Sequence, residues 1–273
     1  MEKFTLEIKR RWPAMTSQNK SKKSIIKSVL LLSVLVFCVY QCNKTKTLTV
    51  DDIIQKNIKA RGGAENWAKV ENITMEGIYV SFSEPEPFKI WRQRPNLYRF
   101  DSIRIKKTVI HVYDGQNAWW INPLMGPPHE KPGIIPSQNN LDKVTLRERF
   151  FEPVFWNYKN KSHQVELEGK ENFDDKDCYK LKVTLSDSTI EYWYIDAESF
   201  LEVGMTGDTY DFGMKNSLEK FFSNYKDVDS LKFPFLIESE YGQRYRTMEI
   251  ENIELYTEID SSVFVMPDSI EKK

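Results

Sequence analysis

Histidine is the residue most often used for acid–base catalysis and zinc binding. The 273-residue chain has only three, at His111, His129 and His163. None has another His or Cys two to four residues further along, which is the usual spacing in zinc sites. His111 alternates with Val109 and Tyr113, as a packed strand residue does. The chain also lacks the G-x-S-x-G segment of hydrolases and a glycine-rich phosphate loop.

Acidic residues are plentiful, but their spacing is not that of a site. Asp174, Asp175 and Asp177 fit a hairpin turn and lack the alternating ligands and terminal Glu of a calcium loop. Glu249 and Glu251 alternate with apolar residues and fit the solvated face of a strand. The sequence therefore predicts no catalytic residues, no metal site and no cofactor, and we expect a protein that is not an enzyme.

Alternation of polar and apolar residues dominates the chain from about residue 73 to residue 255. In residues 179–185, for example, Tyr, Leu, Val and Leu alternate with Lys, Lys and Thr. Successive side chains of a strand point to opposite faces, so such a strand has one apolar face. Asp114-Gly115 joins two such runs as a hairpin turn does. The pattern predicts about eleven strands joined by short turns, in a mainly β (α+β) fold with a large antiparallel sheet.

A few segments depart from this pattern. Thr49 or Asp51 can cap a helix that ends near Gly62-Gly63, and a second short helix is expected over residues 64–70. Residues 122–140 hold five prolines and two glycines, which is too many for a strand. Residues 141–158 are amphipathic, with a break at Pro153. We expect them to be either a mobile cover over the sheet or an ordinary buried connection.

The N-terminal segment has the features of an export signal. Four lysines between Lys20 and Lys27 precede residues 29–40, a run of 12 that is apolar apart from one serine. A membrane-spanning helix needs about 20 such residues, so residues 1–42 are expected to be a secretory leader. Cys42 suggests lipidation as in bacterial lipoproteins, although Tyr40 and Gln41 stand where small residues normally precede the cysteine. A short uncleaved anchor is the alternative.

The rest of the chain is expected to comprise a linker over residues 43–50, one domain over 51–268 and a tail over 269–273. Beyond residue 42 there are 31 Lys and Arg and 38 Asp and Glu, a net charge near −7. Without a basic cluster, that charge argues against binding to nucleic acid or an anionic membrane surface. Cys178 is the only thiol beyond Cys42, so no internal disulfide is expected.

Several segments together resemble a known family. They are residues 52–63, 94–99, 113–115, 119, 121–123, 178–183, 194–196, 222–225, 232–234, 259–264 and 266–267. In this order and spacing they resemble the LolA/LolB-like outer-membrane lipoprotein-sorting proteins, and residues 52–63 are similar to that family's first helix. The resemblance covers about residues 50 to 268. Each segment alone is a weak match, and the specificity comes from their colinear order.

The resemblance implies an incomplete antiparallel β-barrel whose concave face is covered by helices, with an apolar cavity between them. It also implies a function, because members of the family carry lipoprotein acyl chains or other lipids across the periplasm without turnover or a cofactor. The implied partners are lipid or lipoprotein acyl chains and transport proteins of the envelope. A monomer in the periplasm or at the outer membrane is expected, in contact with the membrane through a lipid anchor if Cys42 is acylated.

We expect the lipid-binding residues to be apolar strand residues that alternate with charged ones, joined by three residues of the 141–158 segment. The predicted set is Ile78, Val80, Phe82, Phe88, Ile90, Tyr98, Phe100, Trp120, Leu146, Phe150, Phe155, Val165, Leu167, Leu181, Val183, Tyr192, Met248 and Ile250. Packed core is the alternative role for each of them.

Two other functions stay open at this point. The first is a structural or interaction module of the cell envelope, with the same half-barrel and a filled interior. The second is a hydrolase whose site the sequence does not reveal. The sequence specifies neither the cargo nor its headgroup.

Overall fold

The computed structural model describes residues 47–81, 84–116, 118–121, 151–211 and 214–265. The leader over residues 1–42 with Cys42, residues 43–46 of the 43–50 linker and the proline-rich segment lie outside the described residues. From Leu48 on, the described residues belong to one unit, which spans Leu48–Lys273. No helix among them is long and apolar enough to cross a membrane.

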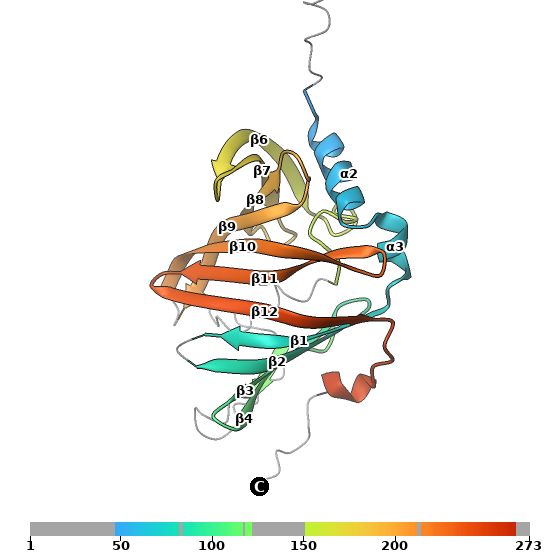
Figure 1. The fold of residues 1–273 in the computed structure, drawn as a ribbon, viewed down its shortest axis with the longest axis vertical. Coiled ribbons are helices and arrows are strands. Elements are labelled where there is room, and N and C mark those ends of the chain that lie inside the picture. The colour runs from blue at the N-terminus through green and yellow to red at the C-terminus, as the bar shows by residue number, and fades with distance from the viewer. Residues whose placement is uncertain (1–46, 82–83, 117, 122–150, 212–213, 266–273) are drawn as a thin grey trace, which may run out of the picture. The chain divides into compact units, whose positions relative to one another are not determined.

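Twelve strands form one antiparallel sheet (Figure 1). They are β1 (Asn72–Val80), β2 (Pro85–Gln93), β3 (Leu97–Arg104), β4 (Lys107–Tyr113), β5 (Ala118–Ile121), β6 (Gln164–Phe173), β7 (Lys176–Thr184), β8 (Ile190–Asp196), β9 (Glu202–Asp211), β10 (Met214–Val228), β11 (Leu231–Tyr241) and β12 (Arg244–Leu255). The mainly β fold predicted from the alternation is confirmed, with one strand more than expected.

The order of the strands shows how the chain folds. It is β5-β4-β3-β2-β1-β12-β11-β10-β9-β8-β7-β6, so every pair of neighbours except β1 and β12 is consecutive in the chain. Two meanders therefore meet where β1 pairs with β12. Strands β5 and β6 are the two edges, so the sheet is not closed and the predicted incomplete barrel is confirmed.

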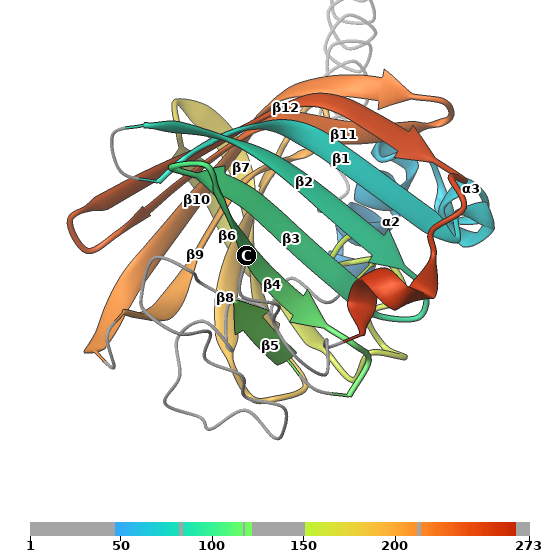
Figure 2. The same cartoon turned by 90° about the horizontal axis from the view of Figure 1, so that it is seen from below.

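The sheet is bent around one of its faces (Figure 2). We call this the inner face and define it by Phe88, Ile90, Tyr98 and Phe100; the opposite surface is the outer face. Helices α2 (Val50–Ala60) and α3 (Ala64–Lys69) lie at one end of the strands, the helix end. The β1–β2, β3–β4 and β11–β12 connections lie at the other, the hairpin end.

The boundaries of α2 follow from local chemistry. The Thr49 hydroxyl accepts a hydrogen bond from the Asp52 amide at 3.2 Å, and the Asp52 carboxylate accepts one from the Thr49 amide at 3.0 Å. This capping box satisfies two amides that the first turn leaves free. The helix stops before Gly62 and Gly63, whose φ angles are 107° and 89°. A Cβ on Gly62 would lie 2.2 Å from the Ser230 carbonyl oxygen, so glycine is required there.

Part of the outer face is covered as well. After β12 the chain reaches the 3₁₀ helix η1 (Ser261–Phe264), where Phe264 packs with Val112 and Trp119 of β4 and β5. The Arg99 guanidinium donates to the Val263 carbonyl at 2.7 Å and fixes this segment against β3. The C-terminal segment therefore buries the outer side of β3–β5 and leaves the inner side of these strands to other partners.

Candidate functional site

The strand register brings predicted residues from distant parts of the chain onto the inner face. Residues directly opposite each other in an antiparallel pair point to the same side of the sheet. Ile90 lies opposite Phe100, Phe100 opposite His111, and His111 opposite Trp120. These four positions on β2, β3, β4 and β5 therefore form a continuous row across the inner face.

We call the apolar group that surrounds Ile90 and Phe100 on the inner face the first inner cluster. Phe88, Ile90, Tyr98, Phe100 and Ile250 are buried in it, and Met248 packs against it half-buried. The rings of Phe88 and Phe100 are stacked, with centroids 6.0 Å apart. Among the described residues, those that approach from outside the sheet are Trp67 and Val70, at and just after α3, Phe151 and the half-buried Trp156.

We call the apolar group over β6, β7 and β8 the second inner cluster. Leu181 and Val183 of β7 are fully buried against Ile53 and Ile54 of α2 and against Phe155. Val165 and Leu167 of β6, which lie opposite Val183 and Leu181, pack against the cluster half-buried. Protein side chains therefore already cover the inner face here.

Most of the predicted lipid-binding residues thus share the inner side of the sheet. They are Phe88, Ile90, Tyr98, Phe100, Trp120, Phe155, Val165, Leu167, Leu181, Val183, Met248 and Ile250. Their binding of lipid remains a prediction.

Ile78 and Val80 face outward, contrary to expectation. Ile78 lies opposite Pro87 and Val80 opposite Pro85, whereas inner Phe88 lies opposite Gly77. The inner position is therefore Gly77, and glycine is required there because a Cβ would lie 2.0 Å from the Glu249 carbonyl oxygen, at the bulge between β1 and β12. Since Gly77 contributes no side chain to the inner face, the sequence pattern favoured Ile78 and Val80 as the buried stripe.

Tyr192 is also on the outer face. It lies opposite Lys182, whereas inner Leu181 lies opposite Trp193. Its ring lies 5.0 Å from the Lys180 ammonium and packs half-buried against an outer cluster that contains Cys178. The segment Tyr192-Trp193-Tyr194 is aromatic on both faces, so alternation could not tell which ring points inward. Trp193 is the inner residue of this segment, and the sequence analysis missed it.

Phe82, Leu146 and Phe150 lie outside the described residues, as does Cys42. The predicted cover over 141–158 is described only from residue 151 onward. Its described part does lie on the inner face, because Phe151 packs in the first inner cluster and Phe155 in the second.

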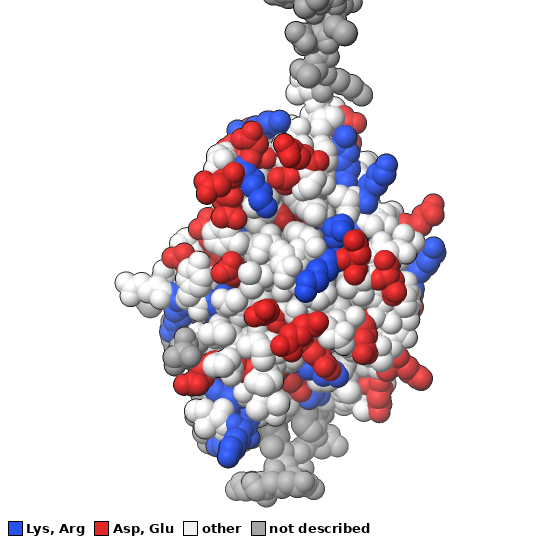
Figure 3. Space-filling model, in the orientation of Figure 1, with Lys and Arg blue, Asp and Glu red and all other residues white. Residues whose placement is uncertain are grey.

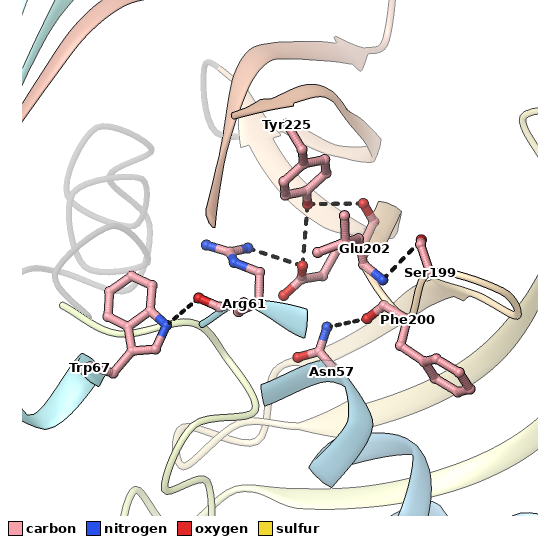
Figure 4. Close-up of polar contacts among 8 residues, drawn as sticks. Asn57, Arg61, Trp67, Ser199, Phe200, Glu202 and Tyr225 are labelled. Carbon is pink, nitrogen blue, oxygen red and sulfur yellow. Dashed lines mark hydrogen bonds and ion pairs between the residues drawn. The ribbon is translucent and has the colours of Figure 1, made fainter. Parts of the chain in front are cut away.

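A buried ion pair fixes α2 to the sheet (Figure 4). Arg61, directly after the helix, donates to the Glu202 carboxylate of β9 at 3.0 Å, and the two side chains are 10% and 2% exposed. The Tyr225 hydroxyl donates to the same carboxylate at 3.2 Å. Burial raises the pKa of Tyr225 well above its usual value, and the Glu202 charge acts in the same direction. Asn57 adds a hydrogen bond of 2.8 Å to the Phe200 carbonyl.

Arg94 performs the same task for α3. Its guanidinium donates to the carbonyls of Val70, at 2.6 Å, and Trp67, at 2.8 Å. It also forms an ion pair with Glu152 of the segment that carries Phe151 and Phe155. One side chain at the β2–β3 turn therefore links the helix end of the sheet to both elements that cover the inner face.

The inner face becomes polar toward the hairpin end, a feature that the sequence analysis missed. On β3 the inner stripe runs from Phe100 through Ser102 to Arg104. Arg104 donates to the Glu86 carboxylate at 2.5 Å and to the Ser81 hydroxyl at 2.6 Å. The same alternation that marks the apolar stripe, followed beyond its last apolar residue, would have revealed these groups.

The ionisable groups here are shifted by their surroundings. Burial lowers the pKa of His111 to about 4, and the charges of Arg246 and Arg104 act in the same direction. The imidazole is therefore neutral at pH 7. Burial raises the pKa of Tyr79 to about 12. In the described part of the chain, no group of three or more His, Cys, Asp or Glu residues could hold a metal ion.

An open hollow of about 540 Å³ lies at the hairpin end of β8–β11. Its lining includes outer residues such as Tyr192, Glu219 and Glu240, so it differs from the expected apolar cavity on the inner face. Acidic and basic side chains are interspersed on the face of the molecule drawn in Figure 3.

Comparison with known proteins identifies the fold. No family model matches the sequence, and no curated protein is similar to it in sequence. A LolA superfamily protein from Nitrosomonas europaea superposes with a TM-score of 0.53 at 12% identity, over 81% of this chain and 99% of its own. A DUF1329 family protein from Desulfovibrio piger gives a TM-score of 0.54 at 14% identity, over 80% and 98%. A domain from Vibrio parahaemolyticus described as outer membrane lipoprotein-sorting gives 0.53 at 12%, over 78% and 94%.

These likenesses define the class of fold. The described unit has the fold of LolA superfamily proteins and of lipoprotein-sorting domains, as the colinear segments of the sequence predicted.

Proposed function

We propose that this protein binds lipid or lipoprotein acyl chains in the bacterial cell envelope and transfers them without enzymatic turnover. The observation that carries the proposal is the first inner cluster, where side chains of β1, β2, β3, β11 and β12 form one apolar surface on the inner side of a bent, open sheet. The likeness in fold to a lipoprotein-sorting domain supports the same function.

The energetics suit such a carrier. Burying an acyl chain of about 14–16 carbons at about 0.8 kcal/mol per methylene is worth roughly 11–13 kcal/mol. Ordering the chain and the protein reduces this value. An apolar surface is therefore sufficient for binding without specific hydrogen bonds, and release requires a change in the shape of that surface.

The two inner clusters differ as binding surfaces. In the second, α2 and Phe155 pack directly on Leu181 and Val183, and the ion pair of Arg61 holds the helix there. In the first, the described residues that pack on the sheet from outside it are Trp67, Val70, Phe151 and the half-buried Trp156. We therefore assign the acyl chain to the first inner cluster.

The proposal includes the location of the protein. Residues 1–42 would direct export, and acylation of Cys42 would hold the domain at a membrane. Mass spectrometry of the mature protein tests both points, since the expected product begins at a diacylated Cys42. An unmodified N-terminus upstream of residue 29 would contradict them.

The face assignment is tested by uptake of a fluorescent acyl chain. Tyr98→Glu places a carboxylate in the first inner cluster and should abolish uptake, because a charge next to the chain costs several kcal/mol. Circular dichroism would check that the variant is folded. Lys180→Glu on the outer face is the control and should leave uptake nearly unchanged. Equal loss in both variants would refute the assignment.

The filled second inner cluster favours one alternative, a structural or interaction module of the envelope that carries no lipid. Extraction of the purified protein with organic solvent, followed by mass spectrometry, separates the two functions. An acyl lipid at about one per protein supports the carrier. A clean blank, together with an unfolding temperature that added lipid does not change, supports the module.

A further inference from the structure

The hairpin end of the inner face is distinguished by its charge. Among the described residues, the basic side chains that the register places on this side are Arg104, Lys107, Lys220, Arg244 and Arg246. The acidic ones are Glu86 and Glu191. Glu86 is paired with Arg104, and Glu191 accepts a hydrogen bond from the Trp193 indole at 2.9 Å. Among the side chains that the structure describes at this end, basic groups therefore outnumber acidic ones, although the unit as a whole is acidic.

Two hydrogen-bond donors at this end stand out because of their burial. The Arg246 guanidinium lies 4.6 Å from the centroid of the Tyr241 ring. Within the described part of the chain, the buried Arg246 Nε and the buried Tyr241 hydroxyl have no hydrogen-bond partner, and Arg246 forms no ion pair there. A buried polar group without a partner costs about 1–3 kcal/mol. Such donors are available to an acceptor group of a bound molecule.

Along β12, the polar hairpin end of the inner face continues directly into the first inner cluster. On β12 the inner positions are Arg244, Arg246, Met248, Ile250 and, beyond the bulge, Ile253. At about 3.3 Å per residue, the apolar part from Met248 to Ile253 is about 16 Å long. One leaflet of a bilayer core is about 15 Å thick, which is the length that one acyl chain occupies in a membrane. A chain lying along the apolar part would put its headgroup at Arg246.

We propose that the hairpin end of the inner face binds the anionic headgroup, phosphate or carboxylate, of the amphiphile whose acyl chain lies on the first inner cluster. Arg246 and Tyr241 supply the donors, and Arg104 and its neighbours supply further positive charge. This inference rests on the proposed function, which it deepens by naming the class of cargo.

The test uses two amphiphiles with the same chain, 1-palmitoyl lysophosphatidic acid and uncharged monopalmitoylglycerol, with inorganic phosphate as a third ligand. We expect the anionic lipid to bind the full protein at least tenfold more tightly than the neutral one. Arg246→Gln should remove this preference without weakening the neutral lipid, and Arg246→Lys should restore part of it. Arg246 is chosen because, unlike Arg104, its loss strands no buried carboxylate. Lys182→Gln on the outer face is the matched control and should retain the preference.

His111 provides a second readout that does not depend on affinity. It lies on the inner face within the electrostatic influence of Arg246 and Arg104. A bound anion partly cancels those charges, so its NMR-detected pKa should rise with the anionic lipid and not with the neutral one.

The binding results distinguish failure of the headgroup site from failure of the proposed function. Equal affinity for both lipids overturns the headgroup site and leaves the proposed function standing. Binding of neither lipid overturns the proposed function and this inference with it. Phosphate alone binding as tightly as the anionic lipid would mean a site for a free anion and would also overturn the headgroup assignment.

Discussion

Replacing Glu202 with Gln should destabilise the protein strongly, because it removes one charge from the ion pair that fixes α2. The pair has an N–O distance of 3.0 Å, and both side chains are buried, at 10% and 2% exposure. The substitution would leave the Arg61 guanidinium buried without a counter-charge, and breaking a buried pair in this way costs about 3–5 kcal/mol. The amide oxygen of Gln can still accept hydrogen bonds from Arg61 and Tyr225, so we expect the lower end, about 3 kcal/mol.

Urea denaturation followed by tryptophan fluorescence measures the loss, since α2 covers the inner face near Trp193. The double variant Arg61→Met/Glu202→Leu removes both charges and should recover most of the stability, because apolar replacements of a buried pair are often neutral or stabilising.

A matched control comes from the outer face. Glu166 pairs with Lys182 at 3.1 Å, but its side chain is 59% exposed. Glu166→Gln should therefore cost less than about 1 kcal/mol. A loss at Glu202 no larger than this control, or a double variant as unstable as the single one, would refute the claim that this ion pair holds the helix.

Other predictions concern single positions on the sheet. Gly77→Ala should cost about 3 kcal/mol in the same assay, because its Cβ would meet the Glu249 carbonyl oxygen at 2.0 Å; an unchanged midpoint would contradict the backbone approach. Cys178 is fully buried, and burial raises its pKa to about 11, so a thiol reagent at pH 8 should label it only after unfolding. Fast labelling of the folded protein would place Cys178 elsewhere. The pKa of His111 is about 4 when folded and about 6.5 when unfolded, so the unfolded state binds more protons between these values. Stability should therefore fall as pH drops from 6.5 to 4, by up to about 3 kcal/mol more than in His111→Gln; parallel pH profiles would refute this.

The sequence was most informative where one face of a strand is charged. Leu181 and Val183 alternate with lysines in β7, and both are buried on the inner face as predicted. The same reasoning failed at Ile78 and Val80, because the register through Gly77 and its bulge depends on how closely β12 approaches. That approach is a tertiary contact between strands far apart in the chain, and the spacing of residues in β1 does not encode it.

Two further features were not accessible to local patterns. The pairing of β1 with β12 joins the first and last strands of the sheet, so no turn signals it. The positive hairpin end arises because Arg104 and Arg246, which lie on different strands, share the inner side of the sheet. Each arginine alone looks like an ordinary charged strand terminus, and only the register shows that they face the same space.

The most direct test of the account is an NMR measurement of contacts between a protonated acyl chain and the otherwise deuterated protein with protonated Phe and Tyr rings. Binding on the first inner cluster predicts nuclear Overhauser effects from the chain methylenes to Phe88, Tyr98 and Phe100. Effects confined to outer rings such as Tyr192 and Phe173, or no effects with saturating lipid, would contradict it.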